Sequence, residues 1–182
     1  MSYNGTGTIL AATILAVAVS YSATAAENKN SSYFEAGFAY SKFEVSDGWF
    51  TNAPGIIRFG SSFGSNLSLE ATLGTSVYDT NFYAGTTLVS ARIDSVYSLA
   101  AKYEFTPNDE SSVYGKLGFG GGQISASTNY GSAWGSDTDI QYGVGFRTNS
   151  GEKNYWSLDY TSYYNKSGVT LTGLGVTYGT RF

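Results

Sequence analysis

The sequence predicts an all-β protein, and three observations support this fold class. From Ser32 onward, apolar residues alternate with small or polar ones, which is the period of a strand with two different faces. Only 13% of the residues are charged, whereas soluble domains carry about 25%. Aromatic residues reach 16% although the mean hydropathy is close to neutral. A disordered chain would have more charge and fewer aromatic residues.

The amino-terminal segment predicts a signal peptide ahead of this fold. An apolar run extends from Thr8 to Ser20. It is too short for a membrane-spanning helix, which needs about 20 residues, and it suits the hydrophobic region of a signal peptide. Ala23-Thr24-Ala25 supplies a cleavage pattern, so residues 1–25 are predicted as the signal peptide and residues 26–182 as the mature domain. No Lys or Arg precedes the run, which leaves open a misplaced start or an N-terminal helix of the domain.

Eight segments of the mature domain show the alternation and are predicted as strands. In order, they are Ser32–Val45, Gly55–Gly64, Leu67–Val77, Ala91–Phe105, Ser112–Ser125, Thr138–Thr148, Tyr155–Tyr164 and Val169–Phe182. The connections between them alternate in length. Short ones lie at 65–66, 106–111 and 149–154, and longer or more variable ones lie at 46–54, 78–90, 126–137 and 165–168. This alternation is typical of an up-and-down meander whose two rims face different surroundings.

Each segment is justified as a strand by one apolar face. Segment by segment, this face carries Phe34, Ala36, Phe38, Tyr40; Ile57, Phe59, Ser61, Phe63; Leu67, Leu69, Ala71, Leu73; Ser95, Tyr97, Leu99, Ala101, Tyr103, Phe105; Val113, Gly115, Leu117, Phe119; Ile140, Tyr142, Val144, Phe146; Trp156, Leu158, Tyr160; and Leu174, Val176, Tyr178, Thr180, Phe182. The interleaved face carries mainly Gly, Ala, Ser and Thr, together with every charge of the strand cores.

The apolar face is predicted to point outward, into lipid. The interior of an eight-stranded ring accommodates only ordinary side chains, which suits Gly, Ser and Thr better than many Phe, Tyr and Leu. A charge on a lipid-facing surface costs about 2–4 kcal/mol at the midplane, which accounts for the uncharged face. Only helices and closed barrels satisfy their backbone hydrogen bonds in lipid. We therefore predict an eight-stranded antiparallel up-and-down transmembrane β-barrel, with a soluble exported β-sandwich as the alternative.

Aromatic residues of the outward face fall at two heights. One set comprises Phe34, Phe63, Tyr103, Phe105, Phe146, Trp156 and Phe182, and the other comprises Tyr40, Tyr97, Phe119 and Tyr160. Girdles of aromatic residues form at the two membrane–water interfaces of such barrels. Ordinary core aromatics at strand spacing are the alternative interpretation.

The inward charges are predicted to form a network inside the barrel. Its members are Glu35, Arg58, Glu70, Lys102, Glu104, Lys116, Arg147 and Asp159. Arg58 and Glu70 should be diagonal neighbours across the turn at 65–66, and Lys102 and Lys116 should lie nearly opposite one another. Buried charges are retained when they are paired. The network is interpreted as a salt-bridged plug, with a narrow or gated solute path as the alternative.

The missing residue types exclude several chemistries. The chain has no Cys and no His. This excludes disulfides, thiolate nucleophiles, a Ser-His-Asp triad and an ordinary transition-metal site. The net charge of −4 gives no reason to expect a nucleic-acid partner. We expect no catalytic residue, no cofactor and no bound metal.

Several stretches resemble the small outer-membrane barrel family of OmpA-like, OmpX-like and Opa-like porin-family proteins. They are SYFEAGFAYSKF (32–43), SNLSLEATLG (65–74), YGKLGFGGG (114–122), IQYGVGF (140–146) and WSLDYTSY (156–163). The terminus LGVTYGTRF resembles the signal that the outer-membrane assembly machinery recognises, with Val176, Tyr178 and Phe182 in matching positions. The resemblance implies a bacterial outer-membrane location and contact with outer-membrane lipid and lipopolysaccharide. Barrel enzymes of this compartment use a catalytic His, so the chain is predicted to be non-enzymatic.

The longer connections hold exposed aromatic candidates for contact with a partner. They are Trp49, Phe50, Phe82, Tyr83, Tyr130 and Trp134. Exposed aromatics of this kind mark contact surfaces, although they equally suit packing on lipopolysaccharide or the barrel rim. We expect a monomer that acts in surface interaction or adhesion, with a host or surface ligand at these loops, or in outer-membrane integrity. A narrow porin-like channel for small solutes is the alternative function.

Overall fold

Ten β-strands make up most of the described chain, which comprises residues 31–45, 48–107 and 110–182 of a computed structural model. In order, they are β1 (Ser32–Val45), β2 (Gly48–Asn52), β3 (Gly55–Phe63), β4 (Leu67–Thr75), β5 (Thr80–Ala84), β6 (Thr87–Glu104), β7 (Ser111–Thr128), β8 (Gly131–Asn149), β9 (Asn154–Lys166) and β10 (Val169–Arg181). The predicted signal peptide, residues 1–25, lies outside the described residues. Within the described ranges, no helix is long and apolar enough to cross a membrane.

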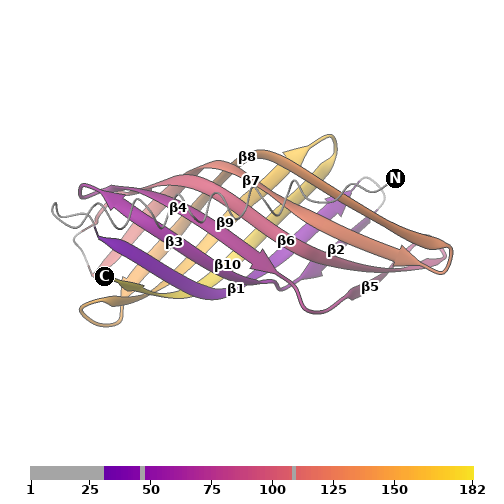
Figure 1. Cartoon of the computed structure of the whole chain (residues 1–182), viewed down its shortest axis with the longest axis horizontal. Helices are drawn as coiled ribbons and strands as arrows, with labels where there is room; N and C mark the ends of the chain where they lie inside the picture. Colours follow the sequence, from indigo (N-terminus) through magenta and orange to yellow (C-terminus); the bar gives the residue numbers. More distant parts are fainter. Residues whose placement is uncertain (1–30, 46–47, 108–109) are drawn as a thin grey trace.

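Eight of these strands close into a ring, as predicted. The order around the ring is β1, β3, β4, β6, β7, β8, β9 and β10, and every neighbouring pair is antiparallel. The ring closes where β10 pairs with β1, from Tyr33↔Arg181 to Glu44↔Thr170. Figure 1 shows the tilted strands wrapping around a central axis. We call the end with the turns at 64–66 and 150–153 and the β6–β7 connection the short-turn end, and the opposite end the long-hairpin end.

Two of the connections predicted as loops contain strands that lie outside the ring. β2 folds back on β1, with Phe50 opposite Phe43, and β5 folds back on β6, with Phe82 opposite Val89. The rings of Phe50 and Phe82 stack at 5.7 Å, with a tilted Phe43 ring 5.2 Å from Phe50. These aromatic contacts hold both segments extended, because they give each short strand a buried side.

The predicted connection at 126–137 is not a loop either. β7 and β8 stay paired to Thr128↔Gly131, so they form a long hairpin that continues past the ring. Figure 1 shows its tip well beyond the tip of the β9–β10 hairpin. The side chains of Gly131 to Thr138 are all exposed. Polar and apolar residues alternate in a strand when one of its faces is buried. A strand that is exposed on both faces shows no such alternation, so the sequence pattern does not reveal it.

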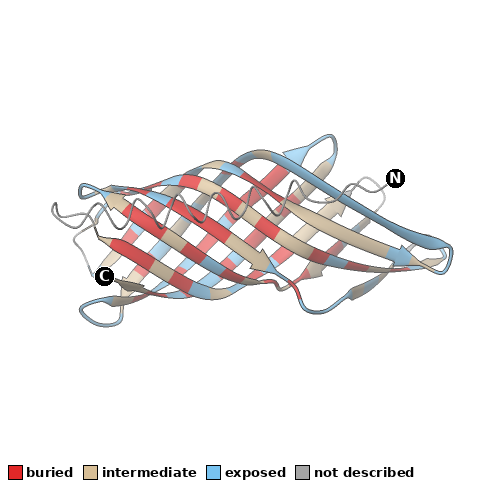
Figure 2. Ribbon diagram, viewed as in Figure 1, coloured by how far each residue is buried: buried red, intermediate tan, exposed pale blue. Residues whose placement is uncertain are grey.

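The predicted assignment of the two faces is confirmed. Figure 2 shows buried and exposed residues alternating along the ring strands. On the outward face, Phe38, Leu117 and Val144 are 68%, 63% and 64% exposed, whereas all eight charged residues of the predicted network are buried. The ring therefore has an apolar exterior and a polar interior, which is the reverse of a soluble sandwich.

Candidate functional site

Arg58 on β3 lies at the centre of the charged residues inside the ring. Its guanidinium donates to both carboxylate oxygens of Asp159 on β9, at 2.6 and 3.0 Å, and to Glu35 on β1 at 3.1 Å. Its Nε lies 3.7 Å from a carboxylate oxygen of Glu70 on β4. All four side chains are at most 1% exposed. One buried cation therefore binds carboxylates from three different strands.

Two lysines help to neutralise the carboxylates that surround Arg58. Lys102 on β6 and Lys116 on β7 are directly opposite in the strand register, as the sequence predicts. Lys116 Nζ lies 2.6 Å from Glu70 Oε1. Lys102 Nζ lies 3.7 to 3.9 Å from three carboxylates, which are those of Glu35, Glu70 and Glu104. The two like charges are tolerated in the buried interior because they share anionic partners.

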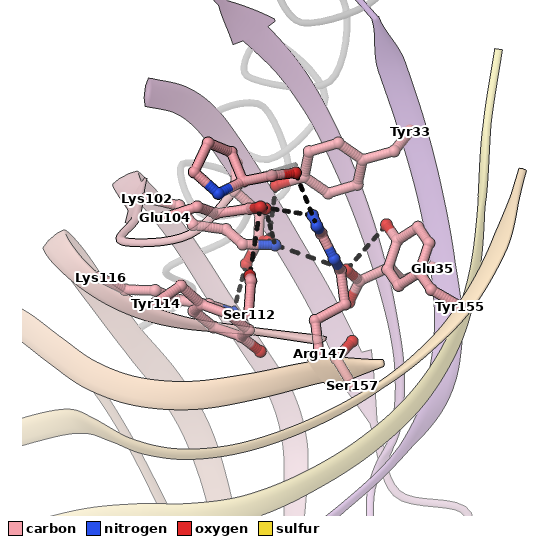
Figure 3. A network of polar contacts seen from close by, with 12 residues as sticks. Tyr33, Glu35, Lys102, Glu104, Ser112, Tyr114, Lys116, Arg147, Tyr155 and Ser157 are labelled. Atoms are coloured by element: carbon pink, nitrogen blue, oxygen red, sulfur yellow. Dashed lines mark hydrogen bonds and ion pairs between the residues drawn. The ribbon is translucent and has the colours of Figure 1, made fainter. Parts of the chain in front are cut away.

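Arg147 extends the network toward the short-turn end. It is paired with Glu104, to which Ser112 also donates at 3.4 Å, and it donates to the Pro107 carbonyl at 3.3 Å. Figure 3 shows Arg147 and Glu104 beside Lys102, with a continuous set of polar contacts between them. The structure thus brings all eight predicted network residues into one set of contacts. A polar vestibule of about 580 Å³ lies between this part of the network and the short-turn end.

Buried tyrosines and hydroxyls complete the network, and the sequence reasoning missed most of them. Tyr33, Tyr114 and Tyr155 donate to Glu70, Asp159 and Glu35 at 2.8, 3.2 and 3.0 Å, respectively. Thr177 also donates to Glu35, at 2.8 Å. Tyr33 and Tyr155 have the same period-two phase as Glu35 and Ser157, so extending the inward face by one position would have identified them.

Glycines on the neighbouring strands make room for these tyrosine rings. Tyr33 lies opposite Gly60, and Tyr114 lies opposite Gly145. A Cβ on Gly60 would lie 2.0 Å from the Tyr33 ring, and one on Gly145 would lie 2.3 Å from the Tyr114 ring. Each tyrosine ring therefore covers a glycine position of the neighbouring strand, which leaves room for the aromatic ring in the narrow interior.

The interior changes from charged to apolar toward the long-hairpin end. A buried cluster there comprises Phe50, Ala91, Ile93, Val96, Tyr163, Tyr164 and Leu171, with Phe43, Phe82, Ile124, Ala126 and Val169 packed against it. Phe50 is only 3% exposed and Phe82 is partly buried, so the prediction of both as exposed loop contacts is wrong. Their aromatic rings pack on each other, because the loops fold back over the ring as β2 and β5.

The other four predicted contact residues are exposed at the long-hairpin end. Trp49, Tyr83, Tyr130 and Trp134 are 59%, 72%, 91% and 61% exposed. They lie on β2, on β5 and, for Tyr130 and Trp134, on the β7–β8 hairpin, so three separate segments contribute them. The three residues of the predicted assembly signal, Val176, Tyr178 and Phe182, are likewise exposed, on the outward side of β10 and just after it.

Polar contacts at this end join β8 to the β9–β10 hairpin. Tyr164 donates to Asp137 at 2.9 Å, and the Asn165 amide donates to Asp139 at 3.2 Å. Donation from the Thr138 amide and from the Tyr164 hydroxyl lowers the pKa of Asp137 below its ordinary value. Asp137 therefore stays a carboxylate at neutral pH and accepts these bonds.

Comparison with known proteins identifies a matching family. The family described as outer membrane protein beta-barrel domain matches residues 10–182. No curated protein sequence matches the chain.

Three solved structures have similar folds. Ail, the attachment invasion locus protein of Yersinia pestis, is 21% identical with a TM-score of 0.64, and the match covers 85% of this chain and 100% of Ail, which was solved with the heparin analogue sucrose octasulfate. Neisserial surface protein A is 17% identical with a TM-score of 0.55, over 83% of this chain and 97% of that one. The N-terminal barrel of Pseudomonas aeruginosa OprF is 17% identical with a TM-score of 0.55, over 82% and 96%. At these identities the similarity establishes the fold.

Replacing Arg58 with Met is expected to lower the free energy of unfolding by about 3–5 kcal/mol, because three buried carboxylates lose their shared cation. Denaturant titration of the chain folded in lipid vesicles measures this change. Arg92→Met is the matched control, since the Arg92 side chain is 45% exposed and its pairs with Asp79 and Asp94 are worth at most about 1 kcal/mol. Equal losses in the two variants would contradict the central role of Arg58.

Gly145→Ala is expected to cost about 1–3 kcal/mol, because the new methyl group would overlap the Tyr114 ring. Gly115→Ala, on the outward face of the adjacent strand, is the control, since its Cβ would meet only the Gly143 carbonyl oxygen at 4.0 Å. The same vesicle titration compares the two. If both variants unfold like the unmodified chain, the tyrosine–glycine packing does not stabilise the barrel.

Proposed function

Because the chain belongs to the outer membrane protein beta-barrel family, we propose that it is a non-enzymatic surface-binding barrel with a closed lumen. The family places it in the bacterial outer membrane, where the apolar outward face contacts lipid. Barrels of this kind have short periplasmic turns and longer extracellular loops. The short-turn end therefore faces the periplasm, and the long-hairpin end faces the outside of the cell.

The observation that carries the proposal is the group of exposed aromatic side chains on the long-hairpin end. Trp49, Tyr83, Tyr130 and Trp134 extend from strands or their connecting turn, so the pairing of those strands holds them in place. Tyr and Trp supply large contact areas at low entropic cost and are enriched among residues that dominate binding energy. This arrangement supports adhesion to a partner at the cell surface.

The charges of the same end indicate the chemistry of the partner. Its described basic side chains are Lys42, Arg92 and Lys166, and its described acidic side chains are Glu44, Asp79, Asp94, Asp137 and Asp139. Each base has an acidic neighbour within 4 Å, at 2.7 Å for Lys42–Glu44, 2.9 Å for Arg92–Asp94 and 3.9 Å for Lys166–Asp137. Ail was solved with a sulfated ligand. The acidic balance here instead favours a protein surface that offers apolar or basic groups.

Two occupied layers support a closed lumen. The charge network around Arg58 fills the interior on the periplasmic side, and the apolar cluster around Phe50 and Ile93 fills it on the outer side. A narrow channel for small solutes is the second candidate function. The observation that favours it is the periplasmic vestibule of about 580 Å³, which reaches Lys102 and Tyr155.

We further infer that the outward face of the barrel serves membrane integrity and assembly. The aromatic girdles of the wall suit a role in outer-membrane integrity, including contact with lipopolysaccharide. The exposed Val176, Tyr178 and Phe182 are available to the assembly machinery before insertion. The closed ring leaves no unpaired strand edge within the membrane, which is consistent with a monomer.

Bacteria that display the Tyr130→Ser, Trp134→Ser double variant are expected to lose binding to host cells or matrix proteins by about 30-fold or more, as for the loss of a dominant contact of about 2 kcal/mol. Counting adherent bacteria measures the loss. Phe105→Ser is the matched control, because Phe105 is an equally exposed aromatic at the periplasmic end. Unchanged adhesion of the double variant, with heat-modifiable migration showing a folded barrel, would exclude this surface as the contact site.

The unmodified protein in a planar lipid bilayer is expected to show no steady single-channel openings, because paired charges and apolar side chains occupy its interior. Current recordings at fixed voltage check this. Steady openings whose conductance changes on Lys102→Ala or Lys116→Ala, but not on the exterior replacement Arg92→Ala, would overturn the closed lumen and favour the channel.

A further inference from the structure

The vestibule at the short-turn end has a positively charged lining. Among the described residues, its cationic lining residues are Lys102, Arg147 and Arg181, whereas its one acidic lining residue is Glu104. Most of the other lining residues are serine, tyrosine or asparagine, whose hydroxyl and amide groups can donate hydrogen bonds. A cavity with an excess of cations and many neutral donors is suited to an anion.

The charge of the whole interior has the same sign. Its five cations are Arg58, Lys102, Lys116, Arg147 and Arg181, and its four carboxylates are those of Glu35, Glu70, Glu104 and Asp159. Every cation except Arg181 lies within 4.0 Å of at least one of these carboxylates. Within the described part of the chain, the Arg181 guanidinium donates only to the amide oxygen of Asn149, at 3.3 Å. One half-buried positive charge therefore has no anionic partner.

Arg147 and Arg181 lie close to the same aromatic ring. Their guanidinium carbons are 5.7 and 4.8 Å, respectively, from the centroid of the Tyr155 ring, and all three residues line the vestibule. Two cations in so small an area repel each other, and the repulsion is stronger where water is partly excluded. An anion that binds both guanidinium groups would relieve it.

The hydrogen-bonding capacity of Arg147 is not exhausted. It is paired with Glu104 and donates to the Pro107 carbonyl, but its Nε has no hydrogen-bond partner among the described residues. The side chain is only 4% exposed, and a buried donor without a partner is costly. An arginine with an unused donor thus lines the cavity in which Arg181 has no anionic partner.

Paired side chains limit the depth of the vestibule. Lys102 lines it and lies 3.7 to 3.9 Å from the carboxylates of Glu35, Glu70 and Glu104. Tyr155, which also lines it, donates to Glu35 at 3.0 Å. A molecule that enters from the short-turn end therefore meets the charge network, so the vestibule is suited to binding rather than to passage.

Exposed charges near the mouth do not cancel this excess. The described ones are Glu110, Glu152 and Lys153, which lie in the turns of the short-turn end and are all exposed. Interactions of exposed charges are screened beyond about 8 Å at physiological ionic strength, whereas buried charges are screened much less. The cations inside the vestibule therefore dominate the potential that a bound molecule experiences.

We propose that the vestibule binds a small organic anion whose phosphate or carboxylate group lies between Arg147 and Arg181. Guanidinium groups bind both anions with paired hydrogen bonds. The volume of about 580 Å³ lies in the range of small-molecule sites, so it accommodates a polar body that contacts the lining hydroxyls. The site does not depend on the adhesion proposal. Only its access from the periplasm rests on the proposed orientation of the barrel.

Isothermal titration calorimetry of the full chain folded in dodecyl maltoside micelles tests the site. The probe is glucose 6-phosphate, and glucose is the neutral control ligand with the same hydroxyl-bearing body. We expect saturable binding of one glucose 6-phosphate per barrel, weakened by added salt, and no binding of glucose. Both ends of the barrel are accessible in a micelle, so the result does not depend on orientation in the membrane.

Two arginine variants then locate the bound phosphate. Arg181→Gln should weaken the binding of glucose 6-phosphate by about tenfold or more, as for the loss of a hydrogen-bonded charge. Arg92→Gln removes an exposed arginine at the opposite end and should leave the affinity unchanged. Heat-modifiable migration verifies that both variants are folded.

The comparison of the two sugars on the unmodified chain stands independently of any variant. Absence of glucose 6-phosphate binding, or equal binding of glucose, would overturn the proposal. An unchanged affinity in Arg181→Gln, or an equal loss in Arg92→Gln, would show that the anion does not bind in the vestibule.

Discussion

Within a membrane, every backbone amide and carbonyl needs a partner, and the closure of β10 on β1 meets this requirement. The other features of the barrel follow from this closure. Eight strands that form a ring leave a narrow interior, so the inward side chains must be small, or must be long side chains that find partners across the ring. Glycines opposite tyrosines satisfy the first condition, and Arg58 with its carboxylates satisfies the second.

The interior uses two different kinds of packing along its axis. On the periplasmic side, three cations compensate three carboxylates. The cations are Arg58, Lys102 and Lys116, and the carboxylates are those of Glu35, Glu70 and Asp159. Tyrosine hydroxyls donate further hydrogen bonds to these carboxylates. Toward the outside, Phe50, Ile93 and Leu171 replace charge with apolar contact. The first layer links strands that are distant around the ring, as Arg58 of β3 does with Asp159 of β9. The second layer holds the folded-back strands β2 and β5 in place.

Outside the membrane, water satisfies backbone groups, so the strands need no longer stay paired on both sides. β7 and β8 extend as a hairpin, and β8 leaves β9 after Tyr142. This freedom produces the outer surface to which we assign binding. The projecting strands present exposed aromatics such as Tyr130 and Trp134.

The eight ring strands, their two faces and the membership of the charge network could be predicted from the amino-acid pattern, because alternation and charge segregation follow directly from one face meeting lipid. The same pattern also indicated that Lys102 faces Lys116, since a short turn sets the register between their strands. The arrangement beyond the membrane could not be predicted in this way. The burial of Phe50 depends on its contact with Phe82, which is distant in sequence, and the extension of β8 leaves both faces of that strand exposed. Neither feature produces a period-two pattern, because neither lipid nor the ring constrains those residues.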